Sequence, residues 1–187
     1  MFNTPKKILF IIDMQNDFID GSFGKKSTKK IVPNVIKLIN HWNNNDIICY
    51  TYDTHYEKTV DDKINYDSTL EGQTYPMYHC IENTPGWHLN EYVFDALSNF
   101  EGPLYKFTKN TYTSWEMVNN ISKIDEINEI FIAGLFTDIS VLSTAILLRA
   151  KLPNIRIFVH SDCCVGSSTV SHLNALHIMK NNGITII

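Results

Sequence analysis

Short apolar runs alternate with longer amphipathic stretches along the chain. Fully apolar runs rich in β-branched residues predict strands buried on both faces, and apolar residues spaced three and four apart predict helices. We expect strands at 7–13, 47–51, 102–107, 127–133, 155–159 and 184–187. We expect helices at 32–44, 87–97, 114–122, 139–150 and 169–181. This alternation predicts a parallel sheet covered on both faces, a three-layer α/β/α doubly wound domain spanning 1–187.

A long polar stretch, 56–85, separates the second strand from the second helix. Unstructured loops of this length are uncommon in compact domains and are often functional. The stretch is therefore a candidate contributor to a site.

Composition excludes several classes of function. The 187 residues are 44% hydrophobic and 19% charged, with a net charge of −4, so no basic footprint for nucleic acid is present. No apolar segment reaches membrane-spanning length and no signal peptide is visible, so we expect no membrane partner. The four cysteines lack zinc-knuckle spacing and two are adjacent, which favours a reduced, cytoplasmic protein.

Charged residues stand where several predicted strands end. They are Asp13, Asp53, Lys106 and Asp162. Ligands of open α/β sheets bind at the carboxyl ends of strands, and a charge there is costly unless it is paired. Each charge alone is explained by a turn cap or a surface partner, but their convergence favours a site. Asp13 and Lys106 then form either a structural ion pair or a general base beside a lysine that stabilises anions.

The segment 130–140 joins an apolar strand to a helix through Gly134. Such a turn brings backbone N–H groups and the Ser140 hydroxyl together, which suits an oxyanion site beside a nucleophile. Plain strand–helix packing explains the turn equally well. Serine without an adjacent histidine base is also a weak nucleophile.

Asp53 and His55 lie two residues apart on an extended segment, a spacing that metal ligands use. Glu71 and His79 follow in the long loop and would complete the coordination. Such a donor set suits Zn²⁺, Fe²⁺ or Mn²⁺. Hydrogen bonding within the loop is the alternative explanation.

Five motifs together resemble the isochorismatase-like cysteine hydrolases, and within them the nicotinamidase/pyrazinamidase group, over nearly the whole chain. They are Ile12-Asp13-Met14-Gln15-Asn16-Asp17-Phe18, Asp53-Thr54-His55, Tyr75-Pro76-Met77-Tyr78-His79-Cys80-Ile81, Lys106-Phe107 and Gly134-Leu135-Phe136-Thr137-Asp138-Ile139-Ser140-Val141. The third motif is one residue longer than is usual in the family.

The resemblance implies a small-amide hydrolase that converts nicotinamide or a related amide to the acid and ammonia. Asp13 would be the catalytic base and Lys106 the catalytic lysine. A cis peptide bond would fall at Leu135–Phe136, and the N–H groups of Phe136 and Ser140 would form the oxyanion hole.

The resemblance also implies a divalent metal held by Asp53, His55 and His79, near Glu71, that binds the pyridine nitrogen of the substrate. Candidates for packing against the substrate ring are Phe18, Tyr75 and Tyr112. Members of the family commonly form homo-oligomers, so we expect one here.

One residue departs from the family, because Ser140 stands where the nucleophilic cysteine is expected. A hydroxyl does not ionise as a thiol does, so amide hydrolysis should be orders of magnitude slower. The residue is an engineered change, marks an inactive protein or another chemistry, or is a natural, slower nucleophile. Two alternative functions follow: an isochorismatase-type vinyl-ether hydrolase, which needs neither cysteine nor metal, and an inactive small-molecule binding homologue.

Overall fold

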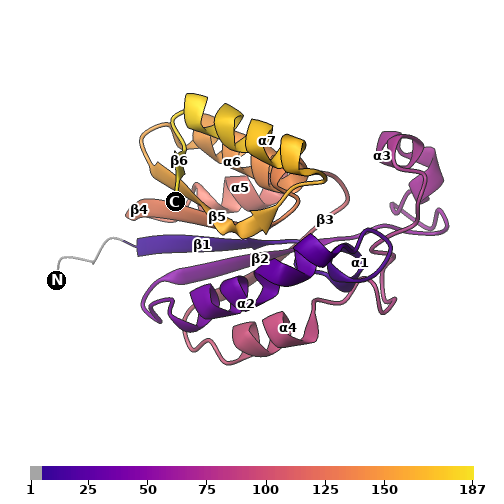
Figure 1. The fold of residues 1–187 in the computed structure, drawn as a ribbon, viewed down its shortest axis with the longest axis horizontal. Helices are drawn as coiled ribbons and strands as arrows, with labels where there is room; N and C mark the ends of the chain where they lie inside the picture. The colour runs from indigo at the N-terminus through magenta and orange to yellow at the C-terminus, as the bar shows by residue number, and fades with distance from the viewer. Residues whose placement is uncertain (1–5) are drawn as a thin grey trace.

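The computed structural model describes residues 6–187, and its centre is a six-stranded sheet of order β3-β2-β1-β4-β5-β6 (Figure 1). All neighbouring strands pair in parallel. The strands are β1 Lys6–Ile12, β2 Ile47–Asp53, β3 Leu104–Lys109, β4 Ile127–Leu135, β5 Arg156–Val165 and β6 Thr185–Ile186. The predicted doubly wound parallel sheet is confirmed. The strand order reverses between β1 and β4, where such sheets bind ligands.

Helices cover both faces of the sheet. The α-helices of the described residues are α1 Asn16–Ile19, α2 Lys26–Asn40, α3 Leu70–Thr74, α4 Glu91–Ser98, α5 Trp115–Ile121, α6 Leu142–Lys151 and α7 Thr169–Asn181, of which α3 lies in a loop away from the sheet (Figure 1). Two shorter turns are the 3₁₀ turn η1, Tyr66–Ser68, and the π-helical turn η2, Thr137–Val141. Helices α2 and α4 lie on one face, and α5, α6 and α7 lie on the other (Figure 1).

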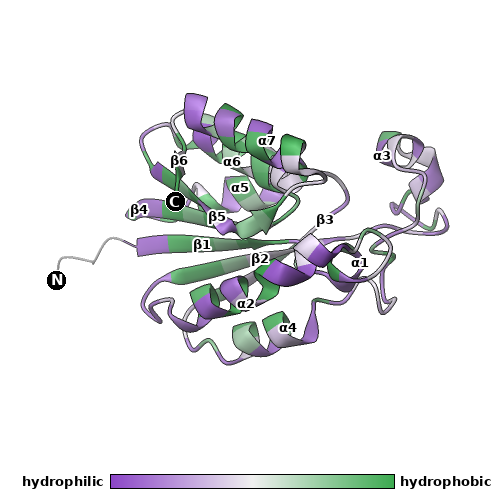
Figure 2. Cartoon of the chain, in the orientation of Figure 1, coloured by the Kyte–Doolittle hydropathy of each residue, from purple (hydrophilic) through white to green (hydrophobic). Residues whose placement is uncertain are grey.

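The central strand β1 is apolar on both faces (Figure 2). Leu9 and Ile11 join the core beneath α2 and α4, whereas Ile8, Phe10 and Ile12 join the core beneath α5, α6 and α7. Because successive side chains of a strand point to opposite faces, one uninterrupted apolar run serves both cores.

Several elements extend beyond their predicted ends. Strands β2, β3, β4 and β5 each continue two to six residues past the apolar run that predicts them. The ladder continues there through polar residues, as in the register pair of Asp53 with Lys109. Helix α2 begins at Lys26, earlier than the predicted position 32. The apolar pattern does not indicate this start, because the first turn of the helix is polar. The apolar pattern therefore misses the strand ends that carry charges.

The loop predicted at 56–85 contains η1 and α3 and returns to the end of β2. The His55 N–H donates to the carbonyl of Cys80 at 2.9 Å, and the carbonyl of His55 accepts from the Glu82 N–H at 2.9 Å. This backbone pairing holds the far end of the loop beside Asp53 and His55.

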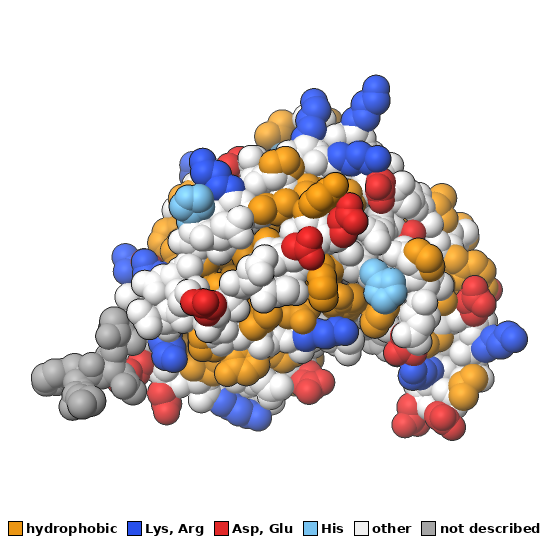
Figure 3. Space-filling view, turned by 90° about the horizontal axis from the view of Figure 1, so that it is seen from below, with side chains coloured by type: hydrophobic (Ala, Val, Ile, Leu, Met, Phe, Trp, Pro, Cys, Tyr) orange, Lys and Arg blue, Asp and Glu red, His pale blue; other side chains and the backbone are white. Residues whose placement is uncertain are grey.

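The outer surface on the α2 and α4 side of the molecule carries charges of both signs. Lys and Arg side chains are scattered there among Asp and Glu side chains and exposed apolar groups (Figure 3). No helix among residues 6–187 is both long and apolar enough to cross a membrane. The absence of a signal peptide, predicted above, concerns in part residues 1–5, which lie outside the described residues.

Candidate active site

A buried charge network occupies the carboxyl ends of β1, β2 and β3. Lys109 Nζ lies 2.8 Å from Asp13 Oδ2 and 3.2 Å from Asp53 Oδ1. The Thr51 hydroxyl donates to Asp13 Oδ1 at 2.6 Å and accepts from the Asp13 N–H at 3.0 Å. All four residues are buried. The sheet order brings them together because β3, β2 and β1 are neighbours.

The lysine of this network is not the predicted one. Lys106 is exposed, and its ammonium lies 4.0 Å from the centre of the Tyr52 ring and 4.9 Å from that of Trp87. The placement of Lys106 beside Asp13 is therefore wrong. Positions 106 and 109 differ by an odd number, so their side chains point to opposite faces of β3, and only Lys109 reaches the buried carboxylates.

The network separates the proton affinities of its two carboxylates. Burial raises the pKa of Asp53, but the Lys109 ammonium and hydrogen bonds with His55 and His79 outweigh burial and hold that pKa well below its usual value. Burial raises the pKa of Asp13, and the charge of Asp53 raises it further. The Lys109 ammonium lowers this pKa, but not enough to cancel the rise. Burial alone would lower the pKa of Lys109, yet the two carboxylates raise it above its usual value. Asp13 is therefore the carboxylate better suited to accept a proton.

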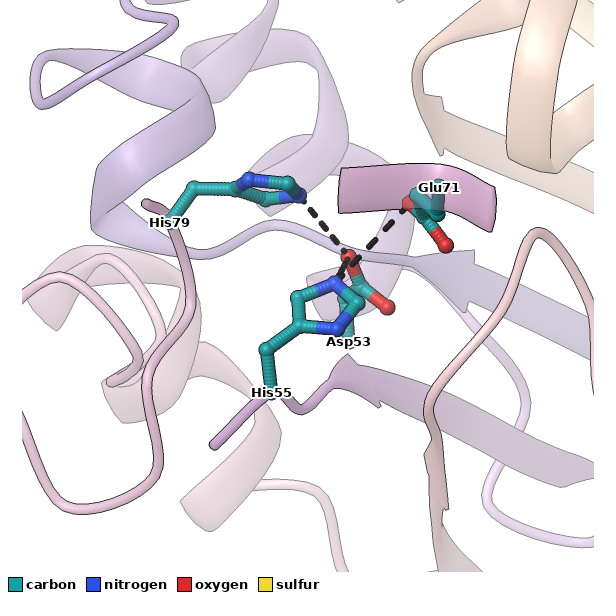
Figure 4. Close-up of side chains that lie close together, drawn as sticks. All are labelled: Asp53, His55, Glu71 and His79. Carbon is teal, nitrogen blue, oxygen red and sulfur yellow. Dashed lines mark hydrogen bonds and ion pairs between the residues drawn. The ribbon is translucent and has the colours of Figure 1, made fainter. Parts of the chain in front are cut away.

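Four side chains converge beside this network (Figure 4). Asp53, His55, Glu71 and His79 each offer one ligand atom, and these atoms lie within 4.8 Å of one another. The Nε2 atoms of His55 and His79 lie 3.0 and 3.5 Å from Asp53 Oδ2, and Glu71 Oε1 lies 3.9 Å from His55 Nε2. The structure thus brings together all four residues predicted as metal ligands.

The chemistry of this cluster fits a divalent cation. The Nδ1 of His79 lies 2.9 Å from the Met77 carbonyl oxygen, which leaves Nε2 to face the carboxylates. Glu71 Oε2 is buried and has no hydrogen-bond partner among residues 6–187. Burial, and then the charge of Asp53, raises the pKa of Glu71. Two carboxylates and two imidazoles that face one another in this way suit a metal such as zinc, iron or manganese.

Gln15 holds the end of β2 beside the candidate metal cluster, a role that was not predicted from the sequence. Its side-chain oxygen accepts from the Asp53 N–H at 2.7 Å, and its side-chain nitrogen donates to the carbonyls of Asp53 and Trp87, both at 2.8 Å. A buried amide that satisfies backbone groups has no periodicity of its own. Its place directly after the first strand, two residues beyond Asp13, was the available signal.

The turn after β4 presents Ser140. The Leu135–Phe136 peptide bond is cis, as the family resemblance implies. Gly134 adopts a φ of 126°, and a Cβ there would lie 2.1 Å from the Ile12 carbonyl oxygen, so the turn requires glycine. The helix predicted at 139–150 instead starts as η2 and continues as α6. Ser140, within η2, is 7% exposed.

Two contacts with the segment after β5 hold this turn. Thr137 Oγ1 lies 2.8 Å from His172 Nδ1 on α7. Asp138 accepts hydrogen bonds from the Ser167 N–H, at 2.7 Å, and from the Ser167 hydroxyl. Neither His172 nor Ser167 was predicted to support the site, because side-chain contacts between distant segments leave no local pattern.

A cavity of about 190 Å³ lies between the metal cluster and the turn. The predicted site residues that line it are Phe18, Asp53, Glu71, Tyr75, His79, Tyr112, Phe136 and Ser140. Cavities of about 150 Å³ accommodate a benzene molecule. The space between the aromatic side chains therefore suits a single small ring.

Comparisons with known proteins agree with this architecture. A curated nicotinamidase from Schizosaccharomyces pombe is 26% identical over 204 residues, which covers 96% of this chain and 91% of that protein. The pyrazinamidase/nicotinamidase of Streptococcus mutans superposes with a TM-score of 0.82 at 25% identity, covering 97% of this chain and 100% of that one. The pyrazinamidase of Pyrococcus horikoshii, solved in complex with zinc, has a TM-score of 0.75 at 23% identity, with coverage of 98% and 99%. The isochorismatase domain model matches residues 7–187, and the chain belongs to this family of hydrolases, which includes nicotinamidases and pyrazinamidases.

Proposed function

We propose that this protein hydrolyses a small aromatic amide of the nicotinamide type to the acid and ammonia. The observation that carries the proposal is that one cavity, of single-ring size, is lined both by Ser140 and by residues of the metal cluster. The similarity to the nicotinamidase of Schizosaccharomyces pombe supports the choice of an amide.

In the proposed mechanism the Ser140 hydroxyl attacks the carbonyl carbon of the amide while Asp13 takes up its proton. Lys109 stabilises the anionic nucleophile, and the N–H groups of Phe136 and Ser140 bind the developing oxyanion. The carbon–nitrogen bond then breaks, and the proton held by Asp13 leaves with the ammonia. Water, deprotonated by Asp13, finally attacks the ester, the bond to the Ser140 oxygen breaks, and Asp13 returns the proton to that oxygen as the acid is released.

Asp53, His55, Glu71 and His79 would hold a divalent metal, and Phe18, Tyr75 and Tyr112 would pack against the ring. A metal held there would supply a Lewis acid toward the nitrogen of a pyridine ring. Zinc, iron and manganese all accept this set of donors, so each is a candidate for the metal.

Ser140 itself favours a second candidate, a vinyl-ether hydrolase of the isochorismatase type. That reaction needs an acid and no thiol, so a hydroxyl at position 140 would not impair it. The metal cluster weighs against this candidate, because ether hydrolysis of this type has no need of it. A homologue that binds its ligand without turnover is the third reading.

The proposal also includes a cytoplasmic location and a homo-oligomeric state. All four cysteines are buried as free thiols, which fits a reducing compartment.

Two measurements on purified protein test the proposed function. Elemental analysis should find about one transition metal per chain, and the Ser140→Cys variant should release ammonia from nicotinamide. Adding Asp13→Asn to that variant should abolish the release, which controls for contaminating amidase. If metal is present and neither form releases ammonia, the amide is the wrong substrate, and an isochorismate assay and ligand calorimetry decide between the other two readings.

A further inference from the structure

Lys25 stands at the rim of the site cavity on a fixed piece of backbone. It directly precedes α2 and lines the cavity together with Phe136 and Ser140. The Lys25 N–H donates to Thr28 Oγ1 at 2.9 Å, and this fully buried hydroxyl also lies 2.9 Å from the Ile19 carbonyl. The residue is therefore anchored to the first turn of a fifteen-residue helix rather than carried on a loose loop.

The side chain of Lys25 reaches toward the segment after β5. Its ammonium donates to the carbonyl of Ser167 at 2.5 Å and lies 5.9 Å from the centre of the Phe136 ring. Lys25 and Ser167 also line the neighbouring groove, beside His172. The ammonium thus lies on the ridge between the cavity and this groove, where a ligand held at Ser140 would present its outer edge.

The Lys25 ammonium has no carboxylate partner among the described residues. Within residues 6–187 no carboxylate lies within ion-pair distance of its ammonium. The carboxylates that line the cavity, Asp53 and Glu71, belong to the metal cluster. The cavity therefore has a cation-binding inner end and an ammonium at its rim with hydrogen-bonding capacity left for an anion.

We propose that Lys25 is a specificity-determining residue that selects aromatic amides carrying a ring carboxylate in addition to the scissile amide. Nicotinamide is neutral and gains nothing from this ammonium, whereas a carboxylate on the outer edge of the ring gains a charge-assisted hydrogen bond. The proposal rests on the proposed function, because it refines the substrate of the same cavity.

Calorimetric binding tests the proposal without requiring turnover. The ligands are nicotinamide and the four pyridine-3-carboxamides that carry one carboxylate at another ring carbon. They are titrated into metal-loaded protein as it stands, and into Lys25→Met, Lys25→Arg and Lys26→Met. Lys26 is the matched control because it is the next residue, is exposed and does not line the cavity.

We expect at least one carboxylate isomer to bind about tenfold more tightly than nicotinamide, a typical gain for a hydrogen bond to a charged group. Lys25→Met should remove this preference, Lys25→Arg and Lys26→Met should retain it, and nicotinamide should bind all four proteins within about twofold. Added salt should reduce the preference. The proposal is overturned if no isomer is preferred, or if Lys25→Met weakens the neutral and anionic ligands equally. Failure of ammonia release by Ser140→Cys would instead overturn the proposed function, so the two failures are distinguishable.

Discussion

The two halves of the candidate site are built differently. At the ends of β1, β2 and β3, the charges of Asp13, Asp53 and Lys109 are fully buried and satisfy one another. At the turn after β4, the candidate nucleophile is the hydroxyl of Ser140, on a backbone fixed by contacts with the β5–α7 segment.

This difference predicts how substitutions in each half affect the stability of the fold. Buried ions are tolerated only as a paired set, because an ion left alone keeps its cost of desolvation. A side chain at the edge of a cavity can change its chemistry while the backbone around it stays in place. Substitutions that break the charged half should therefore lower the free energy of unfolding strongly, whereas substitutions in the turn half should lower it much less.

The largest expected effect comes from breaking the charged half. Lys109→Met leaves Asp13 and Asp53 buried without their counter-ion and should lower the free energy of unfolding by about 3–5 kcal/mol. Urea denaturation measures this. Lys106→Met, three residues away on the exposed face of β3, is the control and should cost about 1 kcal/mol or less. Equal losses for the two lysines would remove the distinction between them.

Glu71→Gln tests whether Glu71 is a metal ligand in the charged half. We expect metal affinity to fall about tenfold or more, at least the loss seen for residues that only orient metal ligands. The metal-free protein should gain about 1 kcal/mol of stability, because a neutral amide no longer faces the Asp53 carboxylate. Chelator competition and denaturation of the metal-free protein measure the two effects. A stability change of the same sign with and without metal would argue against Glu71 as a ligand.

Substitutions in the turn half should cost less stability than those in the charged half. Asp138→Asn weakens the contacts with Ser167 and should lower the free energy of unfolding by about 1 kcal/mol. Asp125→Asn, an exposed carboxylate before the start of β4, is the control and should change it by no more than about 0.5 kcal/mol. A loss from Asp138→Asn as large as that from Lys109→Met would erase the contrast between the halves.

The smallest expected effect is a pH dependence of the turn half. Burial lowers the pKa of His172, although Asp138 opposes it. The unfolded chain, with a histidine pKa of about 6.5, then binds more protons than the folded one, so stability falls as pH drops below about 6.5. Since the side chain is only partly buried, this contribution should be about 0.5 kcal/mol or less. His172→Gln should flatten the pH profile of unfolding between pH 7 and 5, and an unchanged profile would contradict this assignment.

The fold could be predicted because burial leaves a strong pattern. The strands at the centre of the sheet are apolar on both faces, and helix α7 has the predicted bounds of 169 and 181. Helix α5 begins after Ser114, whose hydroxyl accepts from the Met117 N–H at 3.0 Å. Local chemistry and hydrophobic periodicity decide these features.

The site could be predicted only in part. Asp13, Asp53 and His55 follow directly on buried runs, so their position is visible in the sequence. Lys109 was missed because β3 is an edge strand with exposed residues along it, and its apolar pattern does not indicate where it ends. Gln15 was missed because it bonds backbone groups that have no sequence signature.

We propose that the residue at position 140 is the nucleophile and that the buried Asp13–Lys109 pair activates it. The most direct test compares ammonia release from nicotinamide by the Ser140 protein, Ser140→Cys and Ser140→Ala, all loaded with metal and equally folded. We expect the cysteine form to be faster than the serine form by about a hundredfold or more, because a thiolate forms far more readily. The alanine form should be inactive. Equal rates for the three forms would show that residue 140 is not the nucleophile.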